Sequence, residues 1–236
     1  MTEQRGLAER IAGVQAEVAA AASASGRAPD DVTVVAVCKT ATREAVDAAA
    51  ALGLRHFAEN RVQAAQAKFA DPLPPGCDVH LIGQLQTNKA RPAVALFAMI
   101  ESVDRPSLIV ALEKEAARAG KRLPVLLQVN IAGEEQKSGC EPAEAADLMA
   151  QLAASEWLLP QGLMTIAPLV DDPEDVRPVF RGLRELRDSL QAQFPDVSLA
   201  ALSMGMSNDY PVAIAEGATL IRVGRAIFGS EPTKPA

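Results

Sequence analysis

Aromatic residues, histidine and cysteine are scarce in this sequence of 236 residues: aromatics make up 3% of it, and there are two histidines and three cysteines. Cys38, Cys77 and Cys140 lie far apart and form no Cys-x-x-Cys pair, which argues against a disulfide framework and against a zinc site. Two histidines are too few for a histidine-rich metal centre. We therefore expect no bound metal, and a protein of the reducing cytoplasm.

Dense positive charge and long hydrophobic runs are also missing. The formal net charge is −7 and no cluster of Lys and Arg stands out, so binding to nucleic acid through phosphate neutralisation is not expected. The first residues are polar and charged, and no run of about 18 apolar residues occurs. These absences argue against a signal peptide, a membrane span and a membrane partner.

Hydrophobic residues nevertheless make up 49% of the chain, and they are mostly aliphatic. Their helical spacing predicts a first helix over 3–25. The short, β-branched run 32–38 predicts a buried strand, and Thr42 is expected to cap a helix that ends before Gly53. Similar strands and helices alternate to the end of the chain. The further predicted strands are 56–59, 79–83, 99–103, 124–130, 161–166, 199–205 and 219–224, and the further predicted helices include 106–119, 143–155 and 173–193.

Strand–helix alternation of this kind predicts parallel strands joined by right-handed crossovers. Eight such units favour a single closed (β/α)8 barrel, a TIM barrel, over 1–236. An extra N-terminal helix is expected to take the place of a long last helix, and 229–236 to form a short tail. The alternative is an open, doubly wound sheet. That fold usually carries a Gly-x-Gly-x-x-Gly turn after its first strand, where this chain has Cys-Lys-Thr-Ala-Thr.

A lysine follows the first predicted strand, at the barrel end where functional groups of such folds gather. Lys39 is therefore expected in the mouth of the barrel. Desolvation and nearby cations there would favour the neutral amine, which is the nucleophile that forms a Schiff base. The sequence alone is equally consistent with a solvated lysine that forms an ion pair with Glu59.

The ends of the last two strands carry groups that suit a phosphate. Ser203 offers a hydroxyl, Gly224 allows close approach of the backbone, and the backbone N–H of Arg225 is expected to point at the same anion. A purely structural function of these glycines in tight turns is the alternative. Arg222 shares a strand face with Gly224 and needs an acceptor, either a carboxylate such as Glu216 or a heteroaromatic nitrogen.

Longer motifs resemble those of one known family. They are VVAVCKT (34–40), FAENRVQ (57–63), HLIGQLQTNK (80–89), LLQVNIAGEEQKSG (126–139), GLMTIAP (162–168) and LSMGMSNDYPVAIAEGATLIRVGRAIFG (202–229). In this order, and over most of the chain, they resemble the pyridoxal phosphate homeostasis protein family. The resemblance implies a barrel that binds pyridoxal 5′-phosphate (PLP) and is similar to the N-terminal domain of alanine racemase.

The resemblance also implies which residues contact the cofactor. They are Lys39 as the Schiff-base lysine, Asn60 near the cofactor ring, Ser203, Gly224 and Arg225 as the phosphate cup, Arg222 facing the pyridine nitrogen, and Met204 and Ser207 within the same pocket motif. His80 is also expected among the cofactor-binding residues. The chain departs from the commonest family pattern at Ala58, Arg61, Val79 and Gln84, and none of these changes removes an expected cofactor contact.

These features favour a carrier of PLP over a catalyst. An arginine facing the pyridine nitrogen keeps it unprotonated and weakens the cofactor as an electron sink. Racemisation needs a second acid/base opposite the lysine. The resemblance implies that alanine racemases take a tyrosine for this from an added domain. Here Tyr210 and Cys38 are expected to pack, and His80 to form a hydrogen bond at a strand end.

The sequence therefore predicts a monomeric, non-catalytic protein that buffers PLP or delivers it to the apo forms of PLP-dependent enzymes. Three alternatives stay open. They are a small PLP-dependent amino-acid racemase, a PLP-free Schiff-base aldolase that holds a sugar phosphate, and an interaction scaffold without a cofactor.

Overall fold

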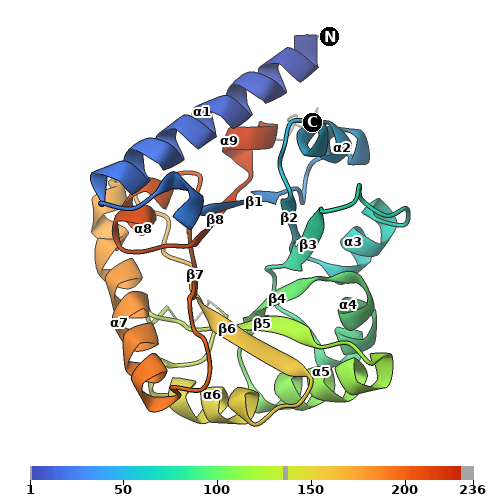
Figure 1. The fold of residues 1–236 in the computed structure, drawn as a ribbon, viewed down its shortest axis with the longest axis vertical. Helices are drawn as coiled ribbons and strands as arrows, with labels where there is room; N and C mark the ends of the chain where they lie inside the picture. The colour runs from blue at the N-terminus through green and yellow to red at the C-terminus, as the bar shows by residue number, and fades with distance from the viewer. Residues whose placement is uncertain (1, 135–137, 230–236) are drawn as a thin grey trace.

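Eight parallel strands close into a barrel in the computed structural model, which describes residues 2–134 and 138–229 (Figure 1). Each strand pairs with the next along the chain, and the last pairs with the first. The predicted barrel is confirmed, and the open sheet is excluded. The strands are β1 Thr33–Val37, β2 His56–Glu59, β3 Asp78–Leu81, β4 Met99–Val103, β5 Leu123–Gln128, β6 Leu158–Met164, β7 Ala201–Met206 and β8 Leu220–Val223.

Helices surround the barrel, and the N-terminal helix lies on the outside of the barrel beside the last helix of the described residues (Figure 1). The last helix has only four residues, and α1 packs on α2, α8 and α9. The extra first helix therefore covers the position that a long final helix would take, as predicted. The helices are α1 Thr2–Ala24, α2 Arg43–Ala51, α3 Val62–Lys68, α4 Ala90–Leu96, α5 Pro106–Ala119, α6 Ala145–Ala153, α7 Arg177–Gln193, α8 Tyr210–Ala215 and α9 Arg225–Phe228.

Local chemistry explains most of the element boundaries. The Thr42 side chain accepts a hydrogen bond from the Ala45 N–H and caps α2. Gly120 follows α5 with a φ of 61°, the left-handed conformation that stops a helix. The predicted helix over 173–193 is divided: Pro173–Val176 form a 3-10 turn, and α7 begins after it with a proline in its first turn. Part of the motif 126–139, at 135–137, and the predicted tail beyond 229 lie outside the described residues.

Two layers of side chains make up the interior. Hydrophobic side chains, including Phe57 on β2 and Phe180 on α7, fill the space between the barrel and its helices. None of the helices in the described ranges combines the length and apolar character that a span of the bilayer requires. The barrel interior itself contains buried polar side chains that hydrogen-bond to one another: His80, Glu101, Ser203 and Arg222.

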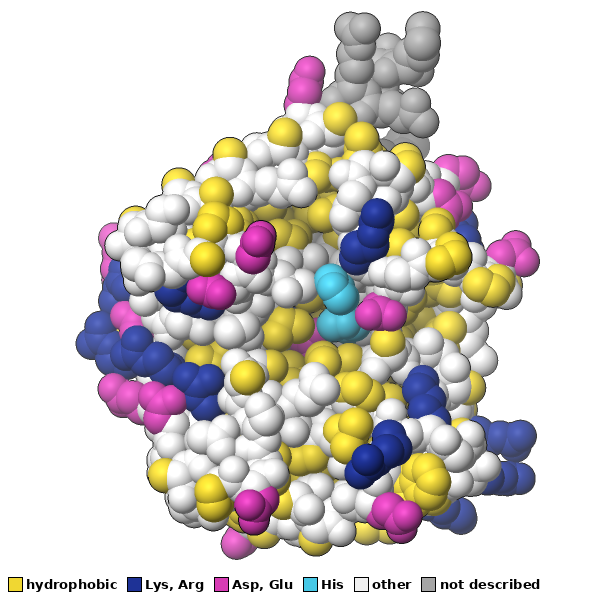
Figure 2. All heavy atoms as spheres, viewed as in Figure 1, with side chains coloured by type: hydrophobic (Ala, Val, Ile, Leu, Met, Phe, Trp, Pro, Cys, Tyr) yellow, Lys and Arg dark blue, Asp and Glu magenta, His cyan; other side chains and the backbone are white. Residues whose placement is uncertain are grey.

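The face at the amino ends of the strands is hollowed, and Figure 2 shows histidine side chains at its centre. His56 begins β2 there and borders a cavity of about 400 Å³. Within the described part of the chain its buried Nδ1 has no hydrogen-bond partner, and the nearest carboxylate oxygen, on Asp78, is 3.8 Å away. Burial, followed by repulsion from His80, holds the pKa of His56 below its usual 6.5.

This lowered pKa predicts a loss of stability at mildly acidic pH. The folded state favours neutral His56, so the benefit is complete above about pH 6.5 and is lost as the pH falls toward the folded pKa. In urea denaturation of the protein without added ligand at pH 7, 6 and 5, the free energy of unfolding should fall more steeply for the wild type than for His56→Gln. Parallel pH profiles would contradict the prediction. The lowered pKa of Glu101 changes the free energy of unfolding only below about pH 4.5, which is outside the pH range of this experiment.

Candidate functional site

A cavity of about 590 Å³ lies at the carboxyl ends of the strands. Its size is within the range of small-molecule sites. Strand ends on both sides of the barrel contribute to it, which is where TIM barrels place their binding residues. The lining residues are Val37, Lys39, Asn60, Ile82, Gly83, Ile166, Leu169, Met206, Ser207, Asn208, Asp209, Arg222, Gly224 and Arg225.

Lys39 lines this cavity from a turn just beyond β1. Its side chain is exposed, so the expected desolvation of the amine by burial is wrong for this structure. The alternative ion pair with Glu59 is also wrong, because Glu59 Oε1 accepts a hydrogen bond from Lys68 Nζ at 2.5 Å. The amine of Lys39 is thus presented at the cavity rim, accessible to a ligand from solvent.

An ion pair between half-buried Lys68 and fully buried Glu59 connects the two strand ends that carry Lys39 and Asn60. Lys68 Nζ donates to the carbonyl of Cys38, which precedes Lys39, and to the carboxylate of Glu59, which precedes Asn60. Glu59 is fully buried, and its Oε2 has no hydrogen-bond partner within the described residues. The ion pair therefore holds the strand ends before Lys39 and Asn60 next to each other. Neither Lys68 nor Glu59 lines the cavity itself.

Two glycines allow backbone segments to approach closely at the cavity wall. A Cβ on Gly83 would lie 2.8 Å from the carbonyl carbon of Asn60 and closer still to its oxygen. A Cβ on Gly224 would lie 3.1 Å from the carbonyl oxygen of Val37. Side chains at these positions would push apart the ends of neighbouring strands. Gly83 was not predicted as a site residue, although it lies in the motif 80–89.

Arg222 forms part of the cavity wall and is only 3% exposed. Its Nη1 donates to Ser203 Oγ at 2.6 Å, and its Nη2 donates to the carbonyl of Thr165 at 2.7 Å. Burial lowers the pKa of Arg222, and the charges of Glu101 and Asp209 oppose that effect.

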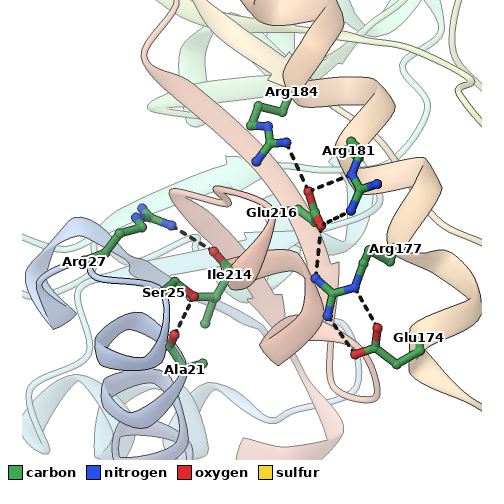
Figure 3. A network of polar contacts seen from close by, with 9 residues as sticks. All are labelled: Ala21, Ser25, Arg27, Glu174, Arg177, Arg181, Arg184, Ile214 and Glu216. Carbon is green, nitrogen blue, oxygen red and sulfur yellow. Dashed lines mark hydrogen bonds and ion pairs between the residues drawn. The ribbon is translucent and has the colours of Figure 1, made fainter.

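The ion pair considered between Arg222 and Glu216 is wrong. Glu216 instead lies on the outside of the barrel among arginines of α7, with Arg177 Nη1 at 3.0 Å and Arg181 Nη2 at 3.1 Å (Figure 3). Arg184 completes this group at 3.3 Å. Glu216 is therefore occupied in joining α7 to α8 and takes no part in the cavity.

A buried carboxylate that was not predicted lies below Arg222. Glu101 Oε2 accepts from Ser203 Oγ at 2.5 Å, and Glu101 Oε1 lies 2.7 Å from His80 Nδ1. Burial acts to raise the pKa of Glu101, but the hydrogen bond and charge of His80, together with Arg222 and Ser203, hold it below its usual value. Glu101 is thus a buried anion connected to Arg222 through Ser203.

The structure brings most of the predicted site residues together. Ser203 and His80 lie beneath the cavity rather than in its lining, because both hydrogen-bond to Glu101. Met204 is fully buried in the hydrophobic core, since successive strand residues point to opposite faces and Ser203 takes the inward one. The predicted residues that line the cavity are Lys39, Asn60, Ser207, Arg222, Gly224 and Arg225.

Several lining residues were missed by sequence reasoning, although all of them except Leu169 lie inside the motifs that were singled out. Asp209 is one: it is buried, its Oδ1 accepts from the Met206 N–H at 2.6 Å, and burial raises its pKa. Asn208 is another, and it accepts from Arg225 Nη2 at 3.4 Å. The remaining missed residues are Val37, Ile82, Gly83, Ile166, Leu169 and Met206.

The donor set of the cavity suits an anionic, partly apolar ligand that carries an aldehyde. It combines the amine of Lys39, the guanidinium groups of Arg222 and Arg225, and the hydroxyl of Ser207 with aliphatic side chains. These groups fit the aldehyde, phosphate and ring of PLP. In the described ranges, no cluster of three or more His, Cys, Asp or Glu side chains is placed to hold a metal ion.

Comparisons with known proteins agree with this geometry. The family model "Alanine racemase, N-terminal domain" matches residues 15–232. A "Pyridoxal phosphate homeostasis protein" of Aquifex aeolicus is 39% identical over 221 residues, which cover 94% of this chain and 96% of that protein. PipY of Synechococcus elongatus PCC7942, solved without PLP, is 40% identical with a TM-score of 0.85, and with PLP bound it is 39% identical with a TM-score of 0.82. Both matches cover 94% of this chain and 100% of PipY. The chain therefore belongs to the pyridoxal phosphate homeostasis protein family, which is built on the alanine racemase N-terminal domain.

Proposed function

We propose that this protein binds PLP through Lys39 and buffers it or delivers it to apo enzymes, as a monomer, without turning over a substrate. The observation that carries the proposal is the cavity itself, which is lined by an exposed lysine and two arginines and has a volume suited to a small molecule. The names of the relatives and the PLP-bound structure of PipY support the same ligand.

In this proposal, different residues of the cavity hold different parts of PLP. Lys39 would hold the cofactor: PLP, when bound, would supply an aldehyde for condensation with the Lys39 amine, with release of water. Ser207, Arg225 and the backbone at Gly224 supply donors for the phosphate. Arg222, held from below by Ser203 and Thr165, presents a buried positive charge to the ring.

The positions of the candidate acid/base groups support a carrier rather than a racemase. The Tyr210 hydroxyl donates to Glu17 of α1, and burial raises its pKa. Burial also raises the pKa of the Cys38 thiol to about 12. Neither residue lines the cavity, and His80 is engaged with Glu101. Among the described residues that line the cavity, Asp209 carries the carboxyl group that could serve a racemase as second acid/base, and its Oδ1 already accepts the Met206 N–H.

Visible absorbance tests the covalent part of the proposal. Wild-type protein incubated with PLP should be yellow, and borohydride should bleach the colour and leave a stable adduct on the peptide that contains Lys39. Lys39→Ala should lose the coloured adduct. The control is Lys114→Ala, which removes an exposed lysine of α5 outside the cavity and should retain the adduct. A colourless wild type, or a coloured Lys39→Ala protein with the adduct elsewhere, would exclude the proposed attachment.

A second assay separates a carrier from the alternatives. In deuterium oxide, a racemase would exchange the Cα proton of an amino acid with inversion, whereas a carrier should show no exchange beyond that of free PLP. An aldolase would be trapped by borohydride only together with a sugar-phosphate substrate. Exchange with inversion that Lys39→Ala and Asp209→Asn both abolish would establish the racemase instead.

A further inference from the structure

A line of hydrogen-bonded side chains crosses the inside of the barrel beneath the cavity. It begins at His80 on β3, continues through Glu101 on β4 and Ser203 on β7, and ends at Arg222 on β8. The three contacts are 2.7, 2.5 and 2.6 Å long, and all four side chains are buried. Only Arg222 reaches the cavity.

These hydrogen bonds connect the buried guanidinium of Arg222 to a buried negative charge. A buried guanidinium needs a counter-charge, yet its two hydrogen bonds go to neutral acceptors, the Ser203 hydroxyl and the Thr165 carbonyl. The anions that act on Arg222 are Glu101 and Asp209. Of these two, Glu101 is the one connected to it by hydrogen bonds.

The Ser203 hydroxyl transmits the effect of Glu101 to Arg222. Its oxygen accepts from Arg222 Nη1, and its hydrogen is donated to Glu101 Oε2. The carboxylate therefore orients the hydroxyl with its lone pairs toward the guanidinium. Hydrogen bonds to charged groups that share a partner strengthen one another inside a protein.

We propose that Glu101 is a positioning residue which, through Ser203, holds the Arg222 guanidinium in its orientation at the cavity wall. The part of this inference that concerns PLP rests on the proposed function; the coupling between Glu101 and Arg222 does not. Glu101 does not line the cavity, so its effect on ligand binding passes through Arg222.

The coupling is tested in PLP-free protein by a cycle of Glu101→Gln, Arg222→Met and the double variant. Glu101→Gln keeps the shape but leaves Arg222 without its connected anion, so Tm should fall by roughly 10 °C. The double variant should lose clearly less than the sum of the two single losses, because the unpaired cation is gone. Additive losses would overturn the inference, whether or not the protein binds PLP.

The effect on the ligand is read by titration of PLP, followed by visible absorbance. Glu101→Gln should weaken PLP binding about tenfold, which corresponds to about 1.4 kcal/mol. The same change should have no further effect in the Arg222→Met background. Glu216→Gln is the matched control: it removes another carboxylate bound to arginines, outside the barrel, and should lower Tm without changing PLP affinity. Equal PLP affinity of the wild type and Glu101→Gln would overturn the inference while leaving the proposed function intact.

Ser203→Ala gives a second way to break the connection if Glu101→Gln folds poorly. It removes the shared hydroxyl and leaves both charges in place. PLP binding should weaken as in Glu101→Gln, and Ser203→Thr, which keeps a hydroxyl, should restore much of it. Ser203→Ala with the PLP affinity of the wild type would show that Arg222 is positioned without Glu101.

Discussion

Gly83→Ala is expected to lower the free energy of unfolding by about 3 kcal/mol and to weaken PLP binding at the same time. The added methyl group would lie 2.8 Å from the carbonyl carbon and from the Cα of Asn60. These are backbone atoms, so the clash is relieved only by moving the ends of β2 and β3 apart. Asn60 lines the cavity, and its displacement is the reason for the expected loss of affinity.

Urea denaturation and PLP titration of the same samples measure both effects. Gly13→Ala is the matched control, because it makes the same chemical change in α1 where no atom lies within 4 Å of the new Cβ. That variant should gain roughly 0.5–1 kcal/mol from helix propensity and retain its PLP affinity. Wild-type stability and affinity in Gly83→Ala would show that the strand ends are further apart than the structure places them.

Lys68→Met is expected to cost about 3–5 kcal/mol of unfolding free energy, the usual effect of breaking a buried ion pair from one side. The change leaves the fully buried Glu59 carboxylate without its cation. It also removes the hydrogen bond to the carbonyl of Cys38, next to Lys39. The turn that carries the lysine amine should become less ordered, and formation of the borohydride-reducible adduct with PLP should slow.

A double variant and a second lysine make this prediction specific. Glu59→Leu/Lys68→Met removes both charges and should recover most of the lost stability. Lys121→Met is the control: Lys121 Nζ donates to the carbonyls of Val94 and Phe97 at 2.7 Å, away from the cavity. It should cost only about 1–2 kcal/mol and leave the rate of adduct formation unchanged. The idea fails if Lys68→Met is no more harmful than Lys121→Met.

The order of strands and helices could be predicted from local patterns. The β-branched run 32–38 contains β1, the Thr42 cap starts α2, and Gly120 stops α5. Such signals depend on neighbours in the chain, so they can be recognised without a fold. They also located Lys39 correctly at a strand end, because the strand before it is continuous and apolar.

The partners of the site residues could not be predicted in the same way. Ser203 and Glu101 are 102 positions apart, and nothing in either local sequence points to the other. Glu216, a residue nearby in sequence, was one of the partners considered for Arg222, whereas the barrel turns Arg222 inward and Glu216 toward the arginines of α7. A contact of this kind exists only after the barrel has closed.

By itself, the sequence determined the alternation of strands and helices, the barrel, and the strand ends where binding groups gather. Closure of the barrel decided which of those groups face the cavity. It placed Ser203 inward and Met204 in the core, and it left the Lys39 side chain exposed at the rim. The physical reason is that hydrophobic periodicity is local, whereas the stagger between strands sets which side chains meet across the barrel.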